Sequence, residues 1–332
     1  MVPVASFGAA LQYFTGNKDH NVALRRIAQD KKWKLNEYGL FQGARALEGD
    51  DEKRIYERLG LEWIPPELRE NTGEIEAAAE KKLPSLINYT DLRGDAQVHS
   101  TWTDGLNSIE EMAQEAKRAG LEYMVISDHS KSLAMTGGLD EKGLEEQGKE
   151  IDALNKKING FKILKGVELN IMKDGSVDIQ AKTLENLEAV GGGIHSYFNL
   201  DREEMTKRVL AAIENPNIDI IYHLTARQLQ KREAISLDVE KVMQAAKDSG
   251  TVLDIDSQPD RLDMKDELIR KAVELGVKMD ISSDSHNKNT FHFLELGIAQ
   301  ARRGWAGCDR IVNTKTVDEF LKSLKSPAFA TS

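Results

Sequence analysis

Histidines and carboxylates recur in this sequence at the points where predicted β-strands end. Five of the seven histidines stand at such points, although histidine has little reason to gather at the ends of core strands. The segments are GDAQVHSTWTDG (His99, Asp104), YMVISDHS (His129), KILKGVELNI (Glu168), AVGGGIHS (His195), IDIIYHLT (His223) and VKMDISSDSH (Asp284, His286). Because a barrel gathers the carboxyl ends of its strands at one rim, these side chains are predicted to converge there.

From Gly94 onward the sequence alternates predicted strands with predicted helices. Ser108 and Glu111 form a capping box at the start of one helix, and Gly120 has the position of a C′ glycine after it. The expected strands are 123–126, 162–169, 218–222, 251–255 and 277–281, and the expected helices are 108–119, 141–157, 203–215, 238–248 and 265–275. Such alternation predicts an α/β protein with a parallel sheet, and this number of units favours a closed barrel.

The first 80 residues have a different pattern, with predicted helices at 21–32, 51–59 and 74–82 around the turn-rich KLNEYGLF. Pro65 and Pro66 prevent a helix between the second and the third of these. A region this short has little core of its own. We therefore predict a small domain at 1–80, a linker at 81–93 and a large domain at 94–325.

The charge of the chain is uneven. With 45 Lys and Arg against 55 Asp and Glu, the net charge is −10, so bulk attraction to duplex DNA is not expected. A stretch from 17 to 34, which includes Lys18, Arg25 and Arg26, nevertheless carries six basic residues against two acidic ones. It is either a solvated helix face or a contact for DNA phosphates.

The sequence predicts a cytoplasmic protein. No apolar run approaches the ~20 residues that span a bilayer, so no membrane partner is expected. The first residues lack the basic and long apolar regions of a secretory signal. A single cysteine, Cys308, excludes an internal disulfide and suits a reducing compartment.

Imidazoles and carboxylates that converge at one rim are typical of a metal site. Any one of these histidines alone is more often a hydrogen-bonded core or loop residue, but their joint occurrence favours metal binding. Gln97 shares a strand face with His99, whereas Asp128 is expected to support its neighbour His129. His20 and His292 stand apart from the pattern and are expected to be structural. The chain is therefore predicted to be a metal-dependent hydrolase.

The motif series GDAQVHSTWTDG, SDHS, GVELNI, IHSYFN, YHLTAR and SDSH resembles the polymerase and histidinol phosphatase (PHP) domain, in the form found at the C-terminus of bacterial and archaeal family X DNA polymerases. This resemblance runs from Gly94 to about 325 and implies a distorted (β/α)7, TIM-like barrel. Upstream, FGAALQYFTGNKDHNVALRRIAQDKKWKLNEYGLF resembles the end of the palm and the thumb of the same polymerases. The first domain is accordingly expected to be a small α+β thumb remnant.

The resemblance also implies a site for up to three divalent metal ions. One ion would be held by Gln97, His99, Glu168 and Asp284, a second by Glu168, His195 and His223, and a third by Asp104, His129 and His286. His99, Glu168, Asp284 and His286 would be catalytic, and Lys131, Arg227 and Arg261 would hold a substrate phosphate. Gln97 replaces a histidine of the family and offers a neutral amide oxygen, which favours Mn²⁺ over Zn²⁺; Zn²⁺, Mg²⁺ and Fe²⁺ are the alternatives.

Three functions follow from this resemblance. The first is a 3′–5′ exonuclease or related phosphoesterase that acts on DNA ends or single-stranded DNA, with Lys18, Arg25 and Arg26 as DNA contacts. The second is a phosphatase for small monoesters of the histidinol-phosphate or nucleotide type. The third is a non-catalytic module for a separately encoded polymerase core. Because the helix-hairpin-helix region and the palm carboxylates are missing from the sequence, polymerase activity is not expected.

Overall fold

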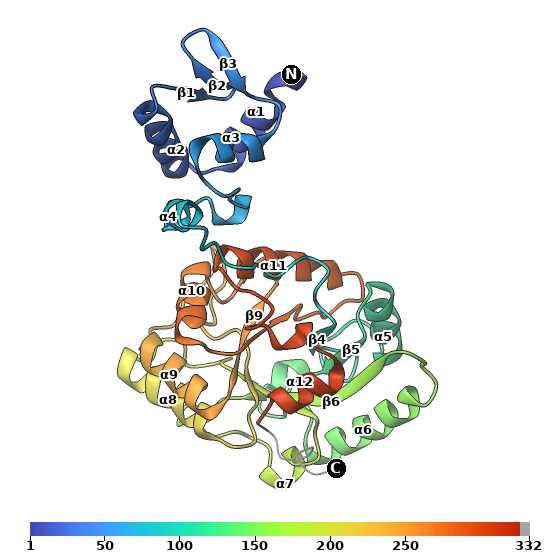
Figure 1. The fold of residues 1–332 in the computed structure, drawn as a ribbon. Helices are drawn as coiled ribbons and strands as arrows, with labels where there is room; N and C mark the ends of the chain where they lie inside the picture. The colour runs from blue at the N-terminus through green and yellow to red at the C-terminus, as the bar shows by residue number, and fades with distance from the viewer. Residues whose placement is uncertain (326–332) are drawn as a thin grey trace. The chain divides into compact units, whose positions relative to one another are not determined.

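The computed structural model describes residues 1–325, and the chain divides into two compact units between Ser85 and Leu86. Figure 1 shows the elements of both units. Among the described residues, no helix has the length and the apolar character needed to cross a membrane.

The first unit packs short helices around a three-stranded antiparallel sheet in the order β1-β2-β3. Its elements are η1 (Val4–Ser6), α1 (Phe7–Thr15), α2 (Lys18–Asp30), β1 (Lys34–Asn36), β2 (Gly39–Gln42), β3 (Arg45–Glu48), α3 (Glu52–Leu59), η2 (Pro66–Leu68) and α4 (Glu74–Ala79). The expected α+β character is present, but KLNEYGLF forms two strands rather than a turn. Leu35 and Leu40 pair across that hairpin and bury both side chains, which favours strands. Helix α1 was not predicted.

A buried arginine holds the first unit together. The side chain of Arg69 is fully buried, and its Nη2 lies 3.1 Å from Glu52 Oε2. Its Nε donates to the carbonyl oxygen of Ile64 at 2.9 Å, and its Nη1 donates to Thr15 Oγ1. Glu52 Oε1 in turn accepts a hydrogen bond from Trp63 Nε1 at 2.8 Å. One side chain thus links α1, α3 and the segment after α3.

Replacing Arg69 with alanine is expected to destabilise the first unit by about 3–5 kcal/mol, because Glu52 would keep a buried charge without its partner. The matched control is Arg54→Ala, since Arg54 is 60% exposed and its nearest carboxylate oxygens lie 3.8 and 4.0 Å away. An exposed pair of this kind contributes at most about 1 kcal/mol. Denaturant unfolding followed by tryptophan fluorescence measures both variants. Equal stability of the two would contradict the role given to Arg69.

The second unit alternates parallel strands with helices, as predicted. Its elements are β4 (Gly94–Val98), α5 (Ile109–Arg118), β5 (Tyr123–Ile126), η3 (Ala134–Thr136), α6 (Glu141–Asn155), β6 (Lys162–Asn170), α7 (Ala181–Leu184), β7 (Ala189–Gly193), α8 (Arg202–Glu214), β8 (Ile220–Ile221), α9 (Val239–Ser249), β9 (Val252–Asp256), α10 (Asp266–Leu275), β10 (Met279–Ser282), η4 (Phe291–Phe293), α11 (Leu294–Arg303), η5 (Val312–Thr314) and α12 (Val317–Ser323). The capping box at Ser108 and Glu111 is present, and Gly120 has a φ of +93°.

The seven strands form a nearly closed barrel. Their order is β10-β9-β8-β7-β6-β5-β4, and all six neighbouring pairs are parallel. The two edge strands approach each other, because the backbone N–H of His99 donates to the carbonyl oxygen of Ser285 at 2.9 Å. The predicted α/β barrel is confirmed, and the carboxyl ends of its strands share one rim.

Alternate residues of each strand fill the barrel interior. Tyr123 and Val125 of β5 belong to the inner cluster, whereas Met124 and Ile126 pack with the outer helices. Phe320 of α12 joins the inner cluster, and its ring centroid lies 5.2 Å from that of Tyr123. The interior is therefore a packed core, and access to the barrel is from the carboxyl rim.

Candidate metal centre

The structure brings together all eight imidazoles and carboxylates that the strand-end pattern singled out. Each stands on or just after a barrel strand, so the parallel order of the strands delivers them to the same rim. His99 and Asp104 follow β4, His129 follows β5, Glu168 lies near the end of β6, His195 follows β7, His223 follows β8, and Asp284 and His286 follow β10. His20, in contrast, is buried in the first unit, with Nδ1 2.6 Å from Glu74 Oε1, and His292 lies in η4.

Glu168 is at the centre of this cluster and is 1% exposed. Its Oε1 lies 3.0 Å from His195 Nε2 and 2.8 Å from His223 Nε2. Its Oε2 lies 3.3 Å from His99 Nε2 and 3.4 Å from His129 Nδ1. One carboxylate thus faces four imidazoles, two on each oxygen, and Glu168 could hold a divalent ion together with them.

Three overlapping groups place their ligand atoms within 4.8 Å of one another. They are His99, Glu168 and Asp284; His129, Glu168 and His195; and His99, Asp104, His129 and His286. Compared with the predicted sets, His129 joins the second group, and His99 joins the third. His223 stays beside the second group through its contact with Glu168 Oε1.

The donor atoms have the chemistry that a divalent cation needs. Both ring nitrogens of His99 and one ring nitrogen each of His129 and His223 are buried without a hydrogen-bond partner within residues 1–325. Burial acts to raise the pKa of Glu168, but the imidazoles of His129 and His195 hold it well below its usual range. Ionised carboxylates beside unpartnered imidazole nitrogens are a donor set that fits bound metal.

Neighbouring side chains orient these donors. Asn170 Oδ1 lies 3.4 Å from His195 Nδ1, and the carbonyl oxygen of Asp284 lies 2.9 Å from His286 Nδ1. Gln97 Nε2 donates to Glu168 Oε2 at 3.1 Å, while Gln97 Oε1 accepts from the Ser282 hydroxyl at 3.3 Å. Partners of this kind fix the direction of a ligand and tune its basicity.

Asp128 supports the loop after β4. Its carboxylate accepts hydrogen bonds from the Ser100 backbone N–H at 2.8 Å, from the Thr103 hydroxyl at 2.6 Å and from Gln147 Nε2 at 2.7 Å. These bonds hold the segment that connects His99 with Asp104.

The three cations expected to hold a phosphate differ in their surroundings. Lys131 Nζ lies 2.9 Å from a carboxylate oxygen of Glu141. Arg227 donates from Nε to the carbonyl oxygen of Arg261 at 2.8 Å and from Nη2 to that of Leu262, so it holds a loop. Arg261 alone approaches the donor cluster, with Nε 3.8 Å from Asp284 Oδ2.

Of the three consecutive glycines of β7, Gly193 borders the site, a role that was not predicted. A Cβ on Gly193 would lie 2.5 Å from Glu168 Oε1 and 2.6 Å from His223 Cε1. A Cβ on Gly191 would lie 1.9 Å from the ring of Tyr222. The run GGG, two residues before the predicted ligand His195, was the available signal, because glycine marks a close approach in a strand.

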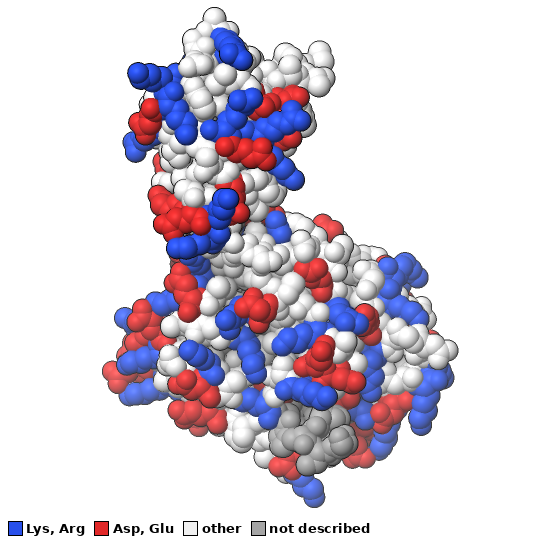
Figure 2. Space-filling view, viewed as in Figure 1, with Lys and Arg blue, Asp and Glu red and all other residues white. Residues whose placement is uncertain are grey.

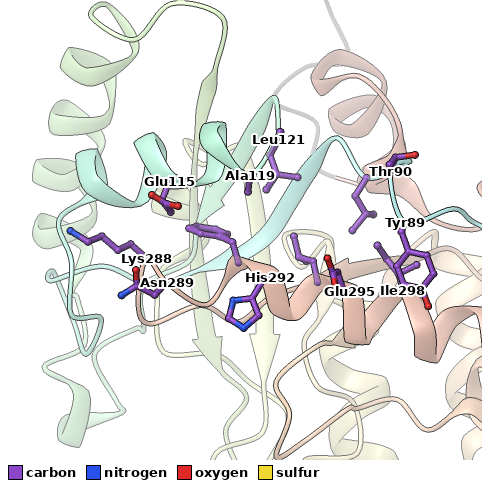
Figure 3. Close-up of a pocket in the computed structure, with 14 residues that line it drawn as sticks. Tyr89, Thr90, Glu115, Ala119, Leu121, Lys288, Asn289, His292, Glu295 and Ile298 are labelled. Carbon is purple, nitrogen blue, oxygen red and sulfur yellow. The ribbon is translucent and has the colours of Figure 1, made fainter. Parts of the chain in front are cut away.

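A small cavity of about 290 Å³ opens beside the donor cluster and is lined in part by Arg261, Asp284 and His286. A larger cavity of about 590 Å³ lies between α5 and α11, where Figure 3 shows Glu115, Leu121 and His292 around it. This larger cavity includes none of the eight donors. Of these two cavities, the smaller one is therefore the candidate site for a substrate of the donor cluster.

The candidate DNA contacts lie on α2 in the first unit. Lys18 and Arg26 are exposed, and Arg25 is half-buried, with its guanidinium carbon 5.8 Å from the centroid of the Tyr13 ring. On the face drawn in Figure 2, Lys and Arg side chains alternate with Asp and Glu, and no broad patch of one sign occurs. The basic residues of α2 therefore do not form part of a broad positive surface on the face that is drawn in Figure 2.

Comparison with known proteins gives two family matches. Residues 10–70 match the DNA polymerase beta thumb, and residues 95–258 match the PHP domain. DNA polymerase/3′-5′ exonuclease PolX of Bacillus subtilis (strain 168) is 37% identical over 327 residues, which cover 97% of this chain and 57% of the Bacillus protein. The chain therefore spans little more than half the length of that relative.

A probable phosphatase of Thermoanaerobacter sp. (strain X514) is 30% identical over 231 residues, which cover 66% of this chain and 89% of that protein. Among solved structures, histidinol phosphate phosphatase of Lactococcus lactis, in complex with zinc, L-histidinol and phosphate, superimposes with a TM-score of 0.49. It is 18% identical and covers 63% of this chain and 91% of that one. A likeness this limited carries no argument about activity.

Proposed function

The chain belongs to the PHP family, with a polymerase thumb ahead of its PHP domain, and on that premise we propose that it hydrolyses phosphodiester bonds at DNA 3′ ends. The activity would require up to three divalent ions, with Mn²⁺ favoured. The observation that carries this proposal is the crowding of four imidazoles around the two oxygens of Glu168. The domain boundaries 1–80, 81–93 and 94–325 and a cytoplasmic location are part of the same proposal.

The residues of the rim would divide the work of hydrolysis. His99, Glu168 and Asp284, with Gln97 beside them, would hold one ion, Glu168, His195 and His223 a second, and Asp104, His129 and His286 a third. When bound, such ions supply Lewis acidity to phosphoester hydrolysis. Arg261 would orient a substrate phosphate, since its guanidinium lies beside Asp284 and lines the small cavity. His286, whose side chain is 34% exposed, would hold the third ion on the side that solvent reaches.

A small-monoester phosphatase is the alternative with an observation in its favour. The probable phosphatase of Thermoanaerobacter matches the chain over 89% of its own length. The thumb match at residues 10–70 favours DNA instead, because a polymerase thumb has no role in binding a small monoester. In the DNA proposal, Lys18, Arg25 and Arg26 contact the strand. A support role for a separate polymerase core is the remaining alternative.

We expect the purified chain to contain divalent metal and to shorten a 3′-recessed DNA in the presence of Mn²⁺. Asp284→Ala should abolish the DNA shortening and lower the metal content, because it removes a carboxylate from one of the three donor groups. Elemental analysis and gel electrophoresis of end-labelled DNA measure the two results. Intact DNA together with phosphate release from monoesters would favour the phosphatase, whereas protein without metal and without either activity would favour the support role.

A further inference from the structure

The cavity of about 290 Å³ beside the metal centre is built from three neighbouring loops. The loop after β8 contributes Gln228, the loop after β9 contributes Gln258 and Arg261, and the loop after β10 contributes Asn287 together with Asp284 and His286. Its volume is at the lower end of the ~300–1,000 Å³ of small-molecule sites. It has room for one small ligand and no room for several units of a polymer.

Four of the eight residues that line this cavity have uncharged side chains, and the charged ones include the carboxylates of Asp260 and Asp284. Arg261 is a cation there, and its Nε already lies 3.4 Å from Asp256 Oδ2. The amides of Gln228, Gln258 and Asn287 carry no charge but offer both donors and acceptors. Binding several phosphates would call for more cations. An uncharged ligand with hydrogen-bonding edges, joined to a single phosphate at the metal centre, matches this lining better.

Two of these amides have free hydrogen-bonding groups. Within residues 1–325 the side chain of Gln228 has no hydrogen-bond partner, and the Asn287 side chain has only the contact of its Oδ1 with the Asn289 backbone N–H at 3.0 Å. Gln258 differs, because its Nε2 donates to the carbonyl oxygens of Ser283 and Asp284. Gln228 and Asn287 are therefore the side chains available to a ligand.

The backbone that carries Gln228 is held in place before any ligand arrives. Its N–H and its carbonyl oxygen both pair with Arg232 at 2.8 Å, and the N–H of Leu229 donates to the carbonyl oxygen of Asp260 at 2.6 Å. Arg227 ties the same region to Arg261 and Leu262. Because the backbone of this loop is already ordered, it loses little conformational entropy when a ligand binds.

We propose that this cavity, the Gln228 pocket, binds the terminal nucleoside of a DNA 3′ end, with Gln228 and Asn287 hydrogen-bonded to the base or sugar. Amide side chains pair well with base edges, which present adjacent donors and acceptors. The inference rests on the proposed function. Water adds to the phosphorus, and the bond from phosphorus to the 3′ oxygen of the preceding nucleotide breaks. That oxygen takes the proton, so a nucleoside 5′-monophosphate leaves the pocket.

Binding of the product tests the pocket without any need for turnover. We expect thymidine 5′-monophosphate to bind the metal-loaded chain at least about tenfold more tightly than methyl phosphate in calorimetric titration, as one or two hydrogen bonds allow. Gln228→Ala/Asn287→Ala should remove most of this preference. Gln244→Ala, which changes an exposed amide on α9, is the matched control and should keep it.

Hydrolysis of two chromogenic diesters gives a second measure. The ratio of kcat/KM for thymidine 5′-(p-nitrophenyl phosphate) to that for bis(p-nitrophenyl) phosphate should fall about tenfold in the double variant and stay constant in Gln244→Ala. Equal binding of both phosphates by the unmodified chain, or an unchanged ratio in the double variant, would overturn the Gln228 pocket even if DNA is digested. If the chain bound thymidine 5′-monophosphate more tightly than methyl phosphate but hydrolysed neither diester, the Gln228 pocket would be supported and the proposed hydrolytic function would be contradicted.

Discussion

Glu168→Gln is expected to lower DNA hydrolysis by at least about 100-fold, since changes to groups that only orient a metal ligand already cost up to that much. The substitution keeps the size of the side chain but removes its negative charge. Both oxygens of Glu168 face imidazoles, at 2.8–3.4 Å, so two of the three donor groups lose their shared carboxylate. Elemental analysis should accordingly show less metal per chain.

The matched control for this variant is Glu145→Gln, which makes the same chemical change on an exposed position of α6. It should retain the metal content and the rate of the unmodified chain. A thermal unfolding scan separates loss of metal from loss of fold, because the barrel core does not depend on Glu168 for packing. If Glu168→Gln kept its metal and its rate within about threefold, Glu168 would not be a metal ligand.

The sequence alone was sufficient to predict the barrel and the convergence of the donors. Both depend on local signals: strand period, strand ends and the residues that follow them. His99 and Glu168 are far apart in the chain, yet the parallel order of β4 to β10 brings them to one rim, as the alternation of strands and helices predicts. The finer assignment of each donor to one ion stays a prediction.

Contacts between distant loops were not predictable in the same way. Arg227 follows a strand end and has the charge to bind phosphate, but its guanidinium donates to carbonyl oxygens of the loop after β9. That loop takes its path partly through Leu262, a non-glycine residue with a φ of +45°. No pattern in the sequence predicts this backbone conformation. The charge and position of Arg227 therefore could not predict that its guanidinium donates to carbonyl oxygens of the neighbouring loop.

Helix α1 and the hairpin of the first unit were missed for a related reason. A Cβ on Gly8 of α1 would lie 2.5 Å from the backbone of Asp51, so this glycine allows α1 to pack closely against the start of α3. A glycine within a short apolar segment usually lowers helix propensity. Tertiary packing determines the helix here, and packing between distant segments is what a local pattern lacks.

The backbone of β7 lies very close to the side chains of the metal centre at its glycine run. Side chains alternate along a strand, so Gly191 and Gly193 face the barrel interior and Gly192 faces outward. The added Cβ distances follow this alternation: 1.9 Å to Tyr222 from Gly191, 3.2 Å to Ile171 from Gly192 and 2.5 Å to Glu168 from Gly193. Gly193 therefore leaves space that the carboxylate and the imidazoles of the site occupy.

Gly193→Ala is expected to reduce metal content and to slow hydrolysis by about 100-fold, the cost of displacing catalytic groups by roughly 1 Å. Its methyl group would press against Glu168 Oε1 and His223 Cε1, and neither can retreat into the packed interior. Gly192→Ala is the matched control: its methyl group meets only the side chains of Ile171 and Ile218, at 3.2 Å or more, so stability should fall by less than about 2 kcal/mol while the metal stays. Elemental analysis, DNA digestion and circular dichroism of both variants decide the outcome. Normal metal content and rate in Gly193→Ala would mean that β7 can shift outward, and that the position of Glu168 is set by β6 alone.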